Sequence, residues 1–227
     1  MERIADIEAL LSQQPIFRSL EQDQIVRLAQ RCRRVRVQKH RHVFRQGESA
    51  EGIYVLAVGQ VVLTIPSSSQ AQEKVVEFFG PGRTFGEAFM FLDRPYMVDA
   101  QALEDSMLLL VEKQAIFDTL DDDPMFARRM LAGLSVRLHT LMQDIATVNL
   151  QNSMQRVAAF LLAQPREDGK TAFACNKNLI ASKLGITPET FSRVLNQLSN
   201  KGLITVNGRD VDIHDVEAIQ QVVFALE

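Results

Sequence analysis

The pattern of apolar and polar residues changes twice along the chain. Residues 3–33 have short helical patterns that break at Gln14-Pro15, and Ser19 is placed to cap a second helix. Residues 35–111 instead contain short apolar runs, such as IYVLAV and QVVLTI, that are separated by glycine, proline and serine. These runs predict a β-barrel or jelly roll that follows a helical lead-in.

One long helix is expected after the β-rich region. Acidic residues lead up to Pro124, and both features favour a helix start. The apolar residues of this helix are spaced alternately by three and four positions, which is typical of a two-stranded coiled coil. The alternative is a helix that packs only on its own barrel, and the spacing favours the paired helix. The predicted dimer interface consists of Leu131, Leu134, Leu138, Leu141, Ile145 and Val148.

The segment at residues 176–199, NKNLIASKLGITPETFSRVLNQLS, predicts a helix-turn-helix. Gly185 permits a sharp turn, Thr187 can cap the second helix, and Pro188 suits the first position of that helix. Two short strands on either side of Asn207-Gly208 follow and predict a hairpin wing. The C-terminal part is therefore predicted to be a winged helix-turn-helix.

The second helix of this motif has an apolar face that leaves polar residues in its first two turns. Arginine can donate two hydrogen bonds to guanine, and glutamate can accept one from a cytosine amino group. A solvated helix face would have the same composition, but the adjoining wing favours DNA binding. Lys201 and Arg209 are candidates for phosphate contacts. The predicted DNA-binding residues are Thr187, Glu189, Ser192, Arg193, Lys201 and Arg209.

Charge and composition limit the class of protein. The net charge of −3 argues weakly against nucleic-acid binding, but residues 170–201 contain five lysines and arginines and one acid. No run of about 18 apolar residues is present, and the N-terminus lacks the features of a signal peptide. We therefore expect a cytoplasmic protein without a membrane segment. Cys32 and Cys175 have no C-x-x-C spacing and predict neither a disulfide nor a metal site. No catalytic motif is found, so no enzyme activity is expected.

The whole chain resembles the cyclic-AMP receptor protein and fumarate–nitrate reduction regulator (CRP/FNR) superfamily of bacterial transcription factors. The resemblance rests on FRQGESAEGIYVLAVGQVVLTI, on FGEAFMFL, on the heptad helix and on ITPETFSRVLNQLSNKGLITVNGRDVDI. It implies an α+β fold in three parts. These are a sensory barrel of the double-stranded β-helix (jelly-roll, cyclic-nucleotide-binding-like) type at residues 1–123, a dimerisation helix at residues 124–150, and a winged helix-turn-helix at residues 151–227.

The E-T-x-S-R arrangement at Glu189, Ser192 and Arg193 resembles the fumarate–nitrate regulator subgroup, which recognises TTGAT-type inverted repeats. The resemblance implies a homodimer that binds a double-stranded DNA operator with TTGAT and ATCAA half-sites. It also implies contact with RNA polymerase, for which residues 67–72 are one candidate surface. An activator is expected, although the position of the operator decides between activation and repression.

The expected effector differs from those of two branches of this superfamily. A cyclic-nucleotide pocket needs an Arg-Ser pair shortly after the Gly-Glu element to bind the phosphate. Tyr96-Met97 stand there instead, so cyclic AMP is not expected. Oxygen-sensing members hold an iron–sulfur cluster on several cysteines, and two cysteines are too few for one.

The runs HVFRQGE, TFGEAFMFLDRP, AQAL, LSVRLH and PETFSR are similar to the Dnr-type regulators of dissimilatory nitrate respiration. That resemblance implies a haem-dependent nitric oxide sensor of denitrification genes, in which nitric oxide shifts the dimer toward a DNA-binding conformation. His139 is the candidate ligand of the haem iron. A different small-molecule effector, or none, without haem is the alternative, and a barrel that regulates an enzyme or channel is a third reading. The candidate effector pocket consists of Gly86, Glu87, Met90, Tyr96, Met97 and His139.

Overall fold

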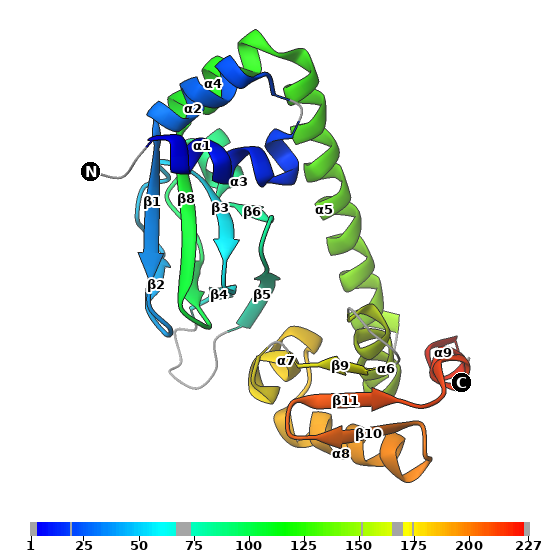
Figure 1. Ribbon diagram of the computed structural model, residues 1–227. Helices are drawn as coiled ribbons and strands as arrows, with labels where there is room; N and C mark the ends of the chain where they lie inside the picture. The colour runs from blue at the N-terminus through cyan, green and yellow to red at the C-terminus, as the bar shows by residue number, and fades with distance from the viewer. Residues whose placement is uncertain are drawn as a thin grey trace. The chain divides into compact units, whose positions relative to one another are not determined.

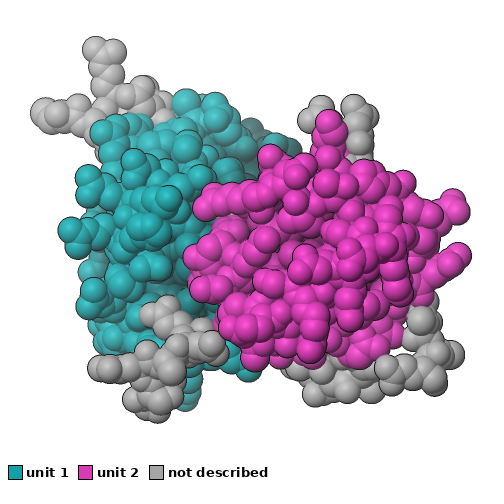
Figure 2. Space-filling model, turned by 90° about the horizontal axis from the view of Figure 1, so that it is seen from below, with its two compact units in different colours: residues 1–137 teal, residues 138–227 magenta. Residues whose placement is uncertain are grey.

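The computed structural model describes residues 4–18, 20–66, 74–150, 152–164, 170–173 and 175–224. The chain divides into two compact units, residues 1–137 and residues 138–227, which Figure 2 shows in teal and magenta. The division falls inside the long helix α5 (Pro124–Leu150). This helix therefore begins in the first unit and ends in the second.

The first unit contains a β-barrel of two four-stranded antiparallel sheets (Figure 1). The strand order is β1-β8-β3-β6 in one sheet and β2-β7-β4-β5 in the other. This arrangement confirms the predicted α+β fold with an N-terminal jelly-roll barrel. Its strands are β1 (Cys32–Val37), β2 (His42–Phe44), β3 (Gly52–Val58), β4 (Val61–Ile65), β5 (Lys74–Phe79), β6 (Thr84–Phe85), β7 (Asp99–Ala102) and β8 (Ser106–Glu112).

Helices cover the outer face of the β1-β8-β3-β6 sheet (Figure 1). Most of them come from the lead-in and from the segment after the last strand. Besides α5, the helices of this unit are α1 (Ile4–Gln13), the 3-10 helix η1 (Pro15–Phe17), α2 (Gln22–Gln30), α3 (Glu87–Phe91) and α4 (Lys113–Asp122).

Strand β3 is buried on both faces because helices cover one side of its sheet and the barrel interior lies on the other. Successive side chains of a strand point to opposite faces. Ile53 and Val55 pack among the helices, whereas Tyr54 and Leu56 point into the barrel. Strand β8 alternates in the same way. This double burial explains why both strands are continuous apolar runs in the sequence.

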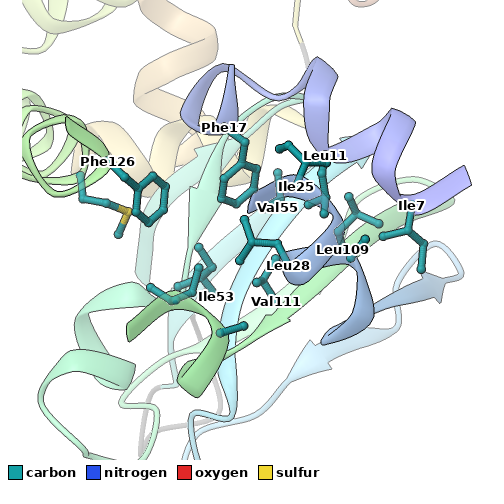
Figure 3. Close-up of a cluster of buried hydrophobic side chains, with 14 of the residues drawn as sticks. Ile7, Leu11, Phe17, Ile25, Leu28, Ile53, Val55, Leu109, Val111 and Phe126 are labelled. Carbon is teal, nitrogen blue, oxygen red and sulfur yellow. The ribbon is translucent and has the colours of Figure 1, made fainter. Parts of the chain in front are cut away.

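A cluster of apolar side chains between the helices and the sheet fixes the start of α5 to the barrel (Figure 3). Phe126 of α5 is fully buried and stacks on Phe17, with ring centroids 5.9 Å apart. Met130, one turn further along α5, is buried in the same cluster. Burying a side chain of this size contributes about 1.5–3 kcal/mol. One face of the first part of α5 therefore packs against the barrel of its own chain.

The second unit contains a helix-turn-helix and a three-stranded antiparallel sheet of order β10-β11-β9 (Figure 1). This finding confirms the predicted winged helix-turn-helix. The sequence pattern did not reveal β9, because its three residues are too few to show a period. The elements are α6 (Ser153–Ala163), β9 (Lys170–Ala172), α7 (Lys177–Leu184), α8 (Pro188–Asn200), β10 (Ile204–Asn207), β11 (Asp210–Ile213) and α9 (Val216–Phe224).

The start of α2 differs from the prediction. The cap of this helix is Glu21, whose side chain accepts from the backbone of Gln24 while the Gln24 side chain accepts from the backbone N–H of Glu21 at 2.7 Å. The prediction of Ser19 as the cap was therefore wrong, and Ser19 itself lies outside the described residues. A reciprocal pair satisfies two free N–H groups at once, which a single serine cannot do.

Helix α4 was not predicted, and it takes up part of the acidic run that was expected to precede α5. Only Asp123 of that run caps α5, where its carboxylate accepts from the backbone N–H of Met125 at 2.8 Å. The predicted start of α5 at Pro124 is confirmed. Among the described helices, none is long and apolar enough to cross a membrane.

Candidate DNA-binding surface and effector site

The turn between α7 and α8 closes by a Schellman motif. Gly185 has φ of +65° and forms the C-cap of α7. Its N–H donates to the carbonyl of Ser182 at 3.2 Å, and the N–H of Ile186 donates to that of Ala181 at 3.0 Å. A left-handed residue is needed here, so glycine at this position lets the chain turn without strain.

Helix α8 begins directly after this turn. Thr187 is its N-cap, because its hydroxyl accepts from the backbone N–H of Thr190 at 3.2 Å, and Pro188 occupies the first helical position. Both roles were predicted. The Thr187 side chain thus stabilises the start of α8, which leaves a contact with DNA as a separate prediction.

The two faces of α8 are sharply different. Its apolar residues are buried, and the polar residues opposite them are exposed. Glu189, Ser192 and Arg193 are related by steps of three and four positions, so they lie on one face of the helix. Among the described residues, Arg193 forms no ion pair. The buried side chains of α8 are those of Phe191, Val194, Leu195 and Leu198.

Glu189 is held in its charged form. The backbone N–H of Glu189 itself, and then the hydroxyl of Thr187, keep the pKa of the Glu189 carboxyl below its usual value. An ionised carboxylate is an acceptor only. It can therefore accept from the amino group of a base but cannot donate to a carbonyl.

The remaining predicted DNA-binding residues lie at exposed ends of elements. Lys201 is the C-cap of α8. Arg209 is at the tip of the hairpin β10-β11, next to Gly208 with φ of +65°. The carbonyl of Arg209 accepts from the N–H of Phe173 at 2.8 Å, so the backbone at this tip is anchored to the residue after β9.

The predicted effector residues Gly86 and Glu87 lie where β6 joins α3. Gly86 is the N-cap of α3 with φ of +92°, a conformation that favours glycine. The Glu87 side chain is buried and accepts from the guanidinium of Arg137 on α5 and from the hydroxyl of Thr84, the latter at 3.5 Å. Buried carboxylates in proteins are usually paired with a cation, and Arg137 takes that place here.

Arg137 contacts this predicted site, although the sequence pattern did not point to it. Its Nη2 donates to the carbonyl of Thr84 at 2.7 Å, and its Nε lies 3.9 Å from a carboxylate oxygen of Glu77. The guanidinium also lies over the ring of Phe79, 5.3 Å from the centroid. Within the first unit, Arg137 therefore connects α5 to β5, β6 and α3. The sequence feature that could have indicated this contact is the position of Arg137 directly before Leu138 of the leucine seam.

The other predicted effector residues have different environments. Met90 and Tyr96 are buried, and Tyr96 stacks on Phe44 with ring centroids 3.6 Å apart. Burial raises the pKa of the Tyr96 hydroxyl, so this group is uncharged. Met97 is 63% exposed, and the His139 side chain is also exposed. His139 is two residues beyond Arg137, about 200° around the helix.

A cavity of about 460 Å³ lies elsewhere on the first unit, between α2 and α4. Ion pairs form part of its lining, among them Arg31 with Asp118 at 3.2 Å. None of the predicted effector residues contributes to this cavity.

The predicted dimer interface is exposed in the single chain. Leu131 and Leu138 are 64% and 61% exposed, Leu141 is 39% exposed, and Leu134 is half-buried. The side chains of Ile145 and Val148 lie outside the described residues. Since Phe126 and Met130 use a different face of α5 for the barrel, the leucine seam remains available for a partner.

Two family models match the chain. The cyclic nucleotide-binding domain matches residues 34–123, and the Crp-like helix-turn-helix domain matches residues 155–222. A barrel of this type joined to this DNA-binding motif defines a DNA-binding transcription regulator, and not an enzyme.

Similar proteins extend over most of the chain. The "Cyclic AMP receptor protein" of Thermus thermophilus is 24% identical over 93% of this chain and 98% of that protein. The crystal structure of DNR from Pseudomonas aeruginosa is 35% identical, covers 97% of this chain and 99% of that one, and has a TM-score of 0.52. The structure of FixK2 from Bradyrhizobium japonicum shares the fold, with a TM-score of 0.77 at 24% identity over 86% of this chain and 99% of that one. The chain belongs to the CRP/FNR family.

Proposed function

We propose that this protein is a homodimeric regulator that recognises TTGAT-type inverted repeats through Glu189, Ser192 and Arg193. The observation that carries the proposal is the exposed polar face of α8, whose opposite face is buried in the second unit. The N-terminal turns of such a helix reach base edges in the major groove. There Arg193 donates to guanine, and the ionised Glu189 accepts from a cytosine amino group.

A dimer is proposed because an inverted repeat has two-fold symmetry, which a two-fold dimer matches. The exposed leucines Leu131, Leu138 and Leu141 support this proposal. Members of the family typically act as dimers. The seam on α5 would then hold two copies of the DNA-binding unit together.

Binding to a series of altered operators tests this proposal. A duplex with TTGAT and ATCAA half-sites is compared with duplexes in which one base pair of each half-site is changed. Changing the G·C pair should cost about 1–3 kcal/mol, the usual value of a bidentate arginine contact. Equal affinity for the intact and G·C-changed operators would overturn the proposed specificity.

For the signal we propose two alternatives: nitric oxide bound by haem, which rests on the resemblance to Dnr-type regulators and on the 35% identity to DNR, and a different effector without haem. The residues of the single chain do not fit a haem inside the barrel. Of the four histidines, three are exposed and His42 is half-buried. The predicted pocket is filled by packed side chains, among them the stacked rings of Tyr96 and Phe44. A different effector without haem is the alternative that this packing favours.

A visible absorption spectrum separates the two proposals. After incubation with haem, a stoichiometric Soret band that shifts with nitric oxide, with tighter operator binding, supports the haem sensor. Intact operator binding without such a band discards haem and keeps the DNA-binding regulator. Activation would further need contact with RNA polymerase, and the residues proposed for it, 67–72, lie outside the described residues.

A further inference from the structure

Arg156 of α6 reaches the turn between the two helices of the helix-turn-helix. Its Nη1 donates to the carbonyl oxygen of Leu184 at 2.8 Å and lies 3.4 Å from that of Gly185. Leu184 is the last residue of α7, and Gly185 is its C-cap. The guanidinium therefore meets the C-terminal end of the first helix of the motif.

The end of α7 requires such a donor. The last carbonyl groups of a helix have no partner within it. The Schellman bonds satisfy the carbonyls of Ala181 and Ser182, and within the described residues no backbone N–H is seen to donate to those of Leu184 and Gly185. A cation at this point also interacts favourably with the negative end of the helix dipole. The bonds from Arg156 are charge-assisted, which makes them stronger than bonds between neutral groups.

The same contacts fix the start of α8. Only Ile186 and Thr187 separate Gly185 from Pro188, the first residue of α8. A side chain that holds the carbonyl of Gly185 therefore constrains where α8 begins. Helix α6, which carries Arg156, also packs directly against α8. Arg156 thus joins three helices of the second unit through one side chain.

We propose that Arg156 is a positioning residue for operator recognition, which sets the orientation of α8 by holding the turn at Leu184 and Gly185. This inference rests on the proposed function of α8 in base recognition. Base contacts depend on geometry within a fraction of an ångström, whereas phosphate contacts tolerate small shifts. Loss of Arg156 should therefore reduce the discrimination between operators more than the affinity for DNA in general.

The experiment uses the full chain with Arg156→Met, Arg156→Lys and the wild-type sequence. Fluorescence anisotropy measures the Kd for the TTGAT inverted repeat and for a duplex with the G·C pair of each half-site changed, at several salt concentrations. The ratio of the Kd for the altered duplex to the Kd for the intact repeat should be roughly tenfold smaller in Arg156→Met than in the wild-type protein. This is the size of effect expected for a charge-assisted hydrogen bond. The Arg156→Lys protein should retain part of this ratio, because an ammonium group can donate to one carbonyl.

The salt dependence separates positioning from a direct phosphate contact. Removing a phosphate contact lowers the slope of log Kd against log salt by about one. The proposal expects an unchanged slope. Arg18→Met serves as the charge control, because it removes an exposed arginine from the first unit, and it should leave the ratio unchanged.

Four results would overturn the proposal or its basis. An unchanged ratio in Arg156→Met overturns the positioning role, and so does a slope reduced by about one with the ratio intact. If circular dichroism shows that Arg156→Met is unfolded, Arg156→Ala, which has no side-chain donor, is measured instead, and a wild-type ratio in that variant overturns the role. A wild-type protein that does not discriminate between the two duplexes overturns the proposed function itself.

Discussion

The guanidinium of Arg137 donates a hydrogen bond to the carboxylate of Glu87, 50 residues away in sequence. The Glu87 side chain is 6% exposed and that of Arg137 is 22% exposed. Arg137 belongs to the helix that carries the predicted dimer seam, and Glu87 belongs to the predicted effector site. This ion pair therefore connects α5 to one of the residues predicted to form the effector site.

Replacing Arg137 by methionine should destabilise the first unit. The change leaves the buried carboxylate of Glu87 without its cation, and breaking a buried pair in this way costs about 3–5 kcal/mol. Because Arg137 keeps 22% exposure, we expect a smaller loss of roughly 2–4 kcal/mol. Urea unfolding measures this loss in the free energy of unfolding. Combining Arg137→Met with Glu87→Gln should restore part of the loss, and a single-variant change below about 0.5 kcal/mol would rule out a structural role.

Arg193 and Lys201 should have distinguishable effects on DNA binding. Arg193→Ala should remove about 1–3 kcal/mol of discrimination at the G·C pair of each half-site. Lys201→Ala should weaken binding to all duplexes equally and lower the salt slope by about one. Anisotropy titrations on intact and altered operators give both quantities. A uniform loss on all duplexes in Arg193→Ala would show that this residue contacts phosphate rather than a base.

The leucine seam of α5 should control the oligomeric state. Leu138→Lys places a charge in the predicted interface and should produce a monomer in sedimentation velocity. Val136→Lys is the matched control, because Val136 is 67% exposed and lies on the opposite face of the same helix turn. A dimer that survives Leu138→Lys but not Val136→Lys would place the interface on the other face.

Cys175 should react slowly with alkylating reagents. Burial raises the pKa of the Cys175 thiol to about 11, although the charge of Arg209 lowers it in part. At pH 8 about one thiol in a thousand is then ionised, and the thiolate is the reactive form. The rate of carbamidomethylation, followed by mass spectrometry, should rise about tenfold per pH unit between pH 7 and 9. A rate that levels off in this range would contradict the raised pKa.

The helix-turn-helix could be predicted in detail because its information is local. Gly185, Thr187 and Pro188 are consecutive or nearly so, and each has a conformational preference that the structure uses. The exposed seam of Leu131 and Leu138 also follows from spacing alone.

The ion pair of Arg137 with Glu87 and the contact of Arg156 with Leu184 could not be predicted in this way. The first contact joins residues 50 positions apart, and the second joins residues 28 positions apart. Neither contact therefore leaves a periodic pattern in the sequence. Strand β6 was missed for another reason: its two residues are too few to show an alternating pattern, although threonine and phenylalanine both favour strands.

Two copies of this chain are expected to bind one inverted repeat. Analytical ultracentrifugation of the full chain with a labelled duplex measures the number of chains per operator directly. We expect two chains on a duplex with TTGAT and ATCAA half-sites whose centres are about 10 base pairs apart, and much weaker binding to a duplex with one half-site. One chain per duplex, or equal affinity for one and two half-sites, would contradict binding of the operator as a dimer.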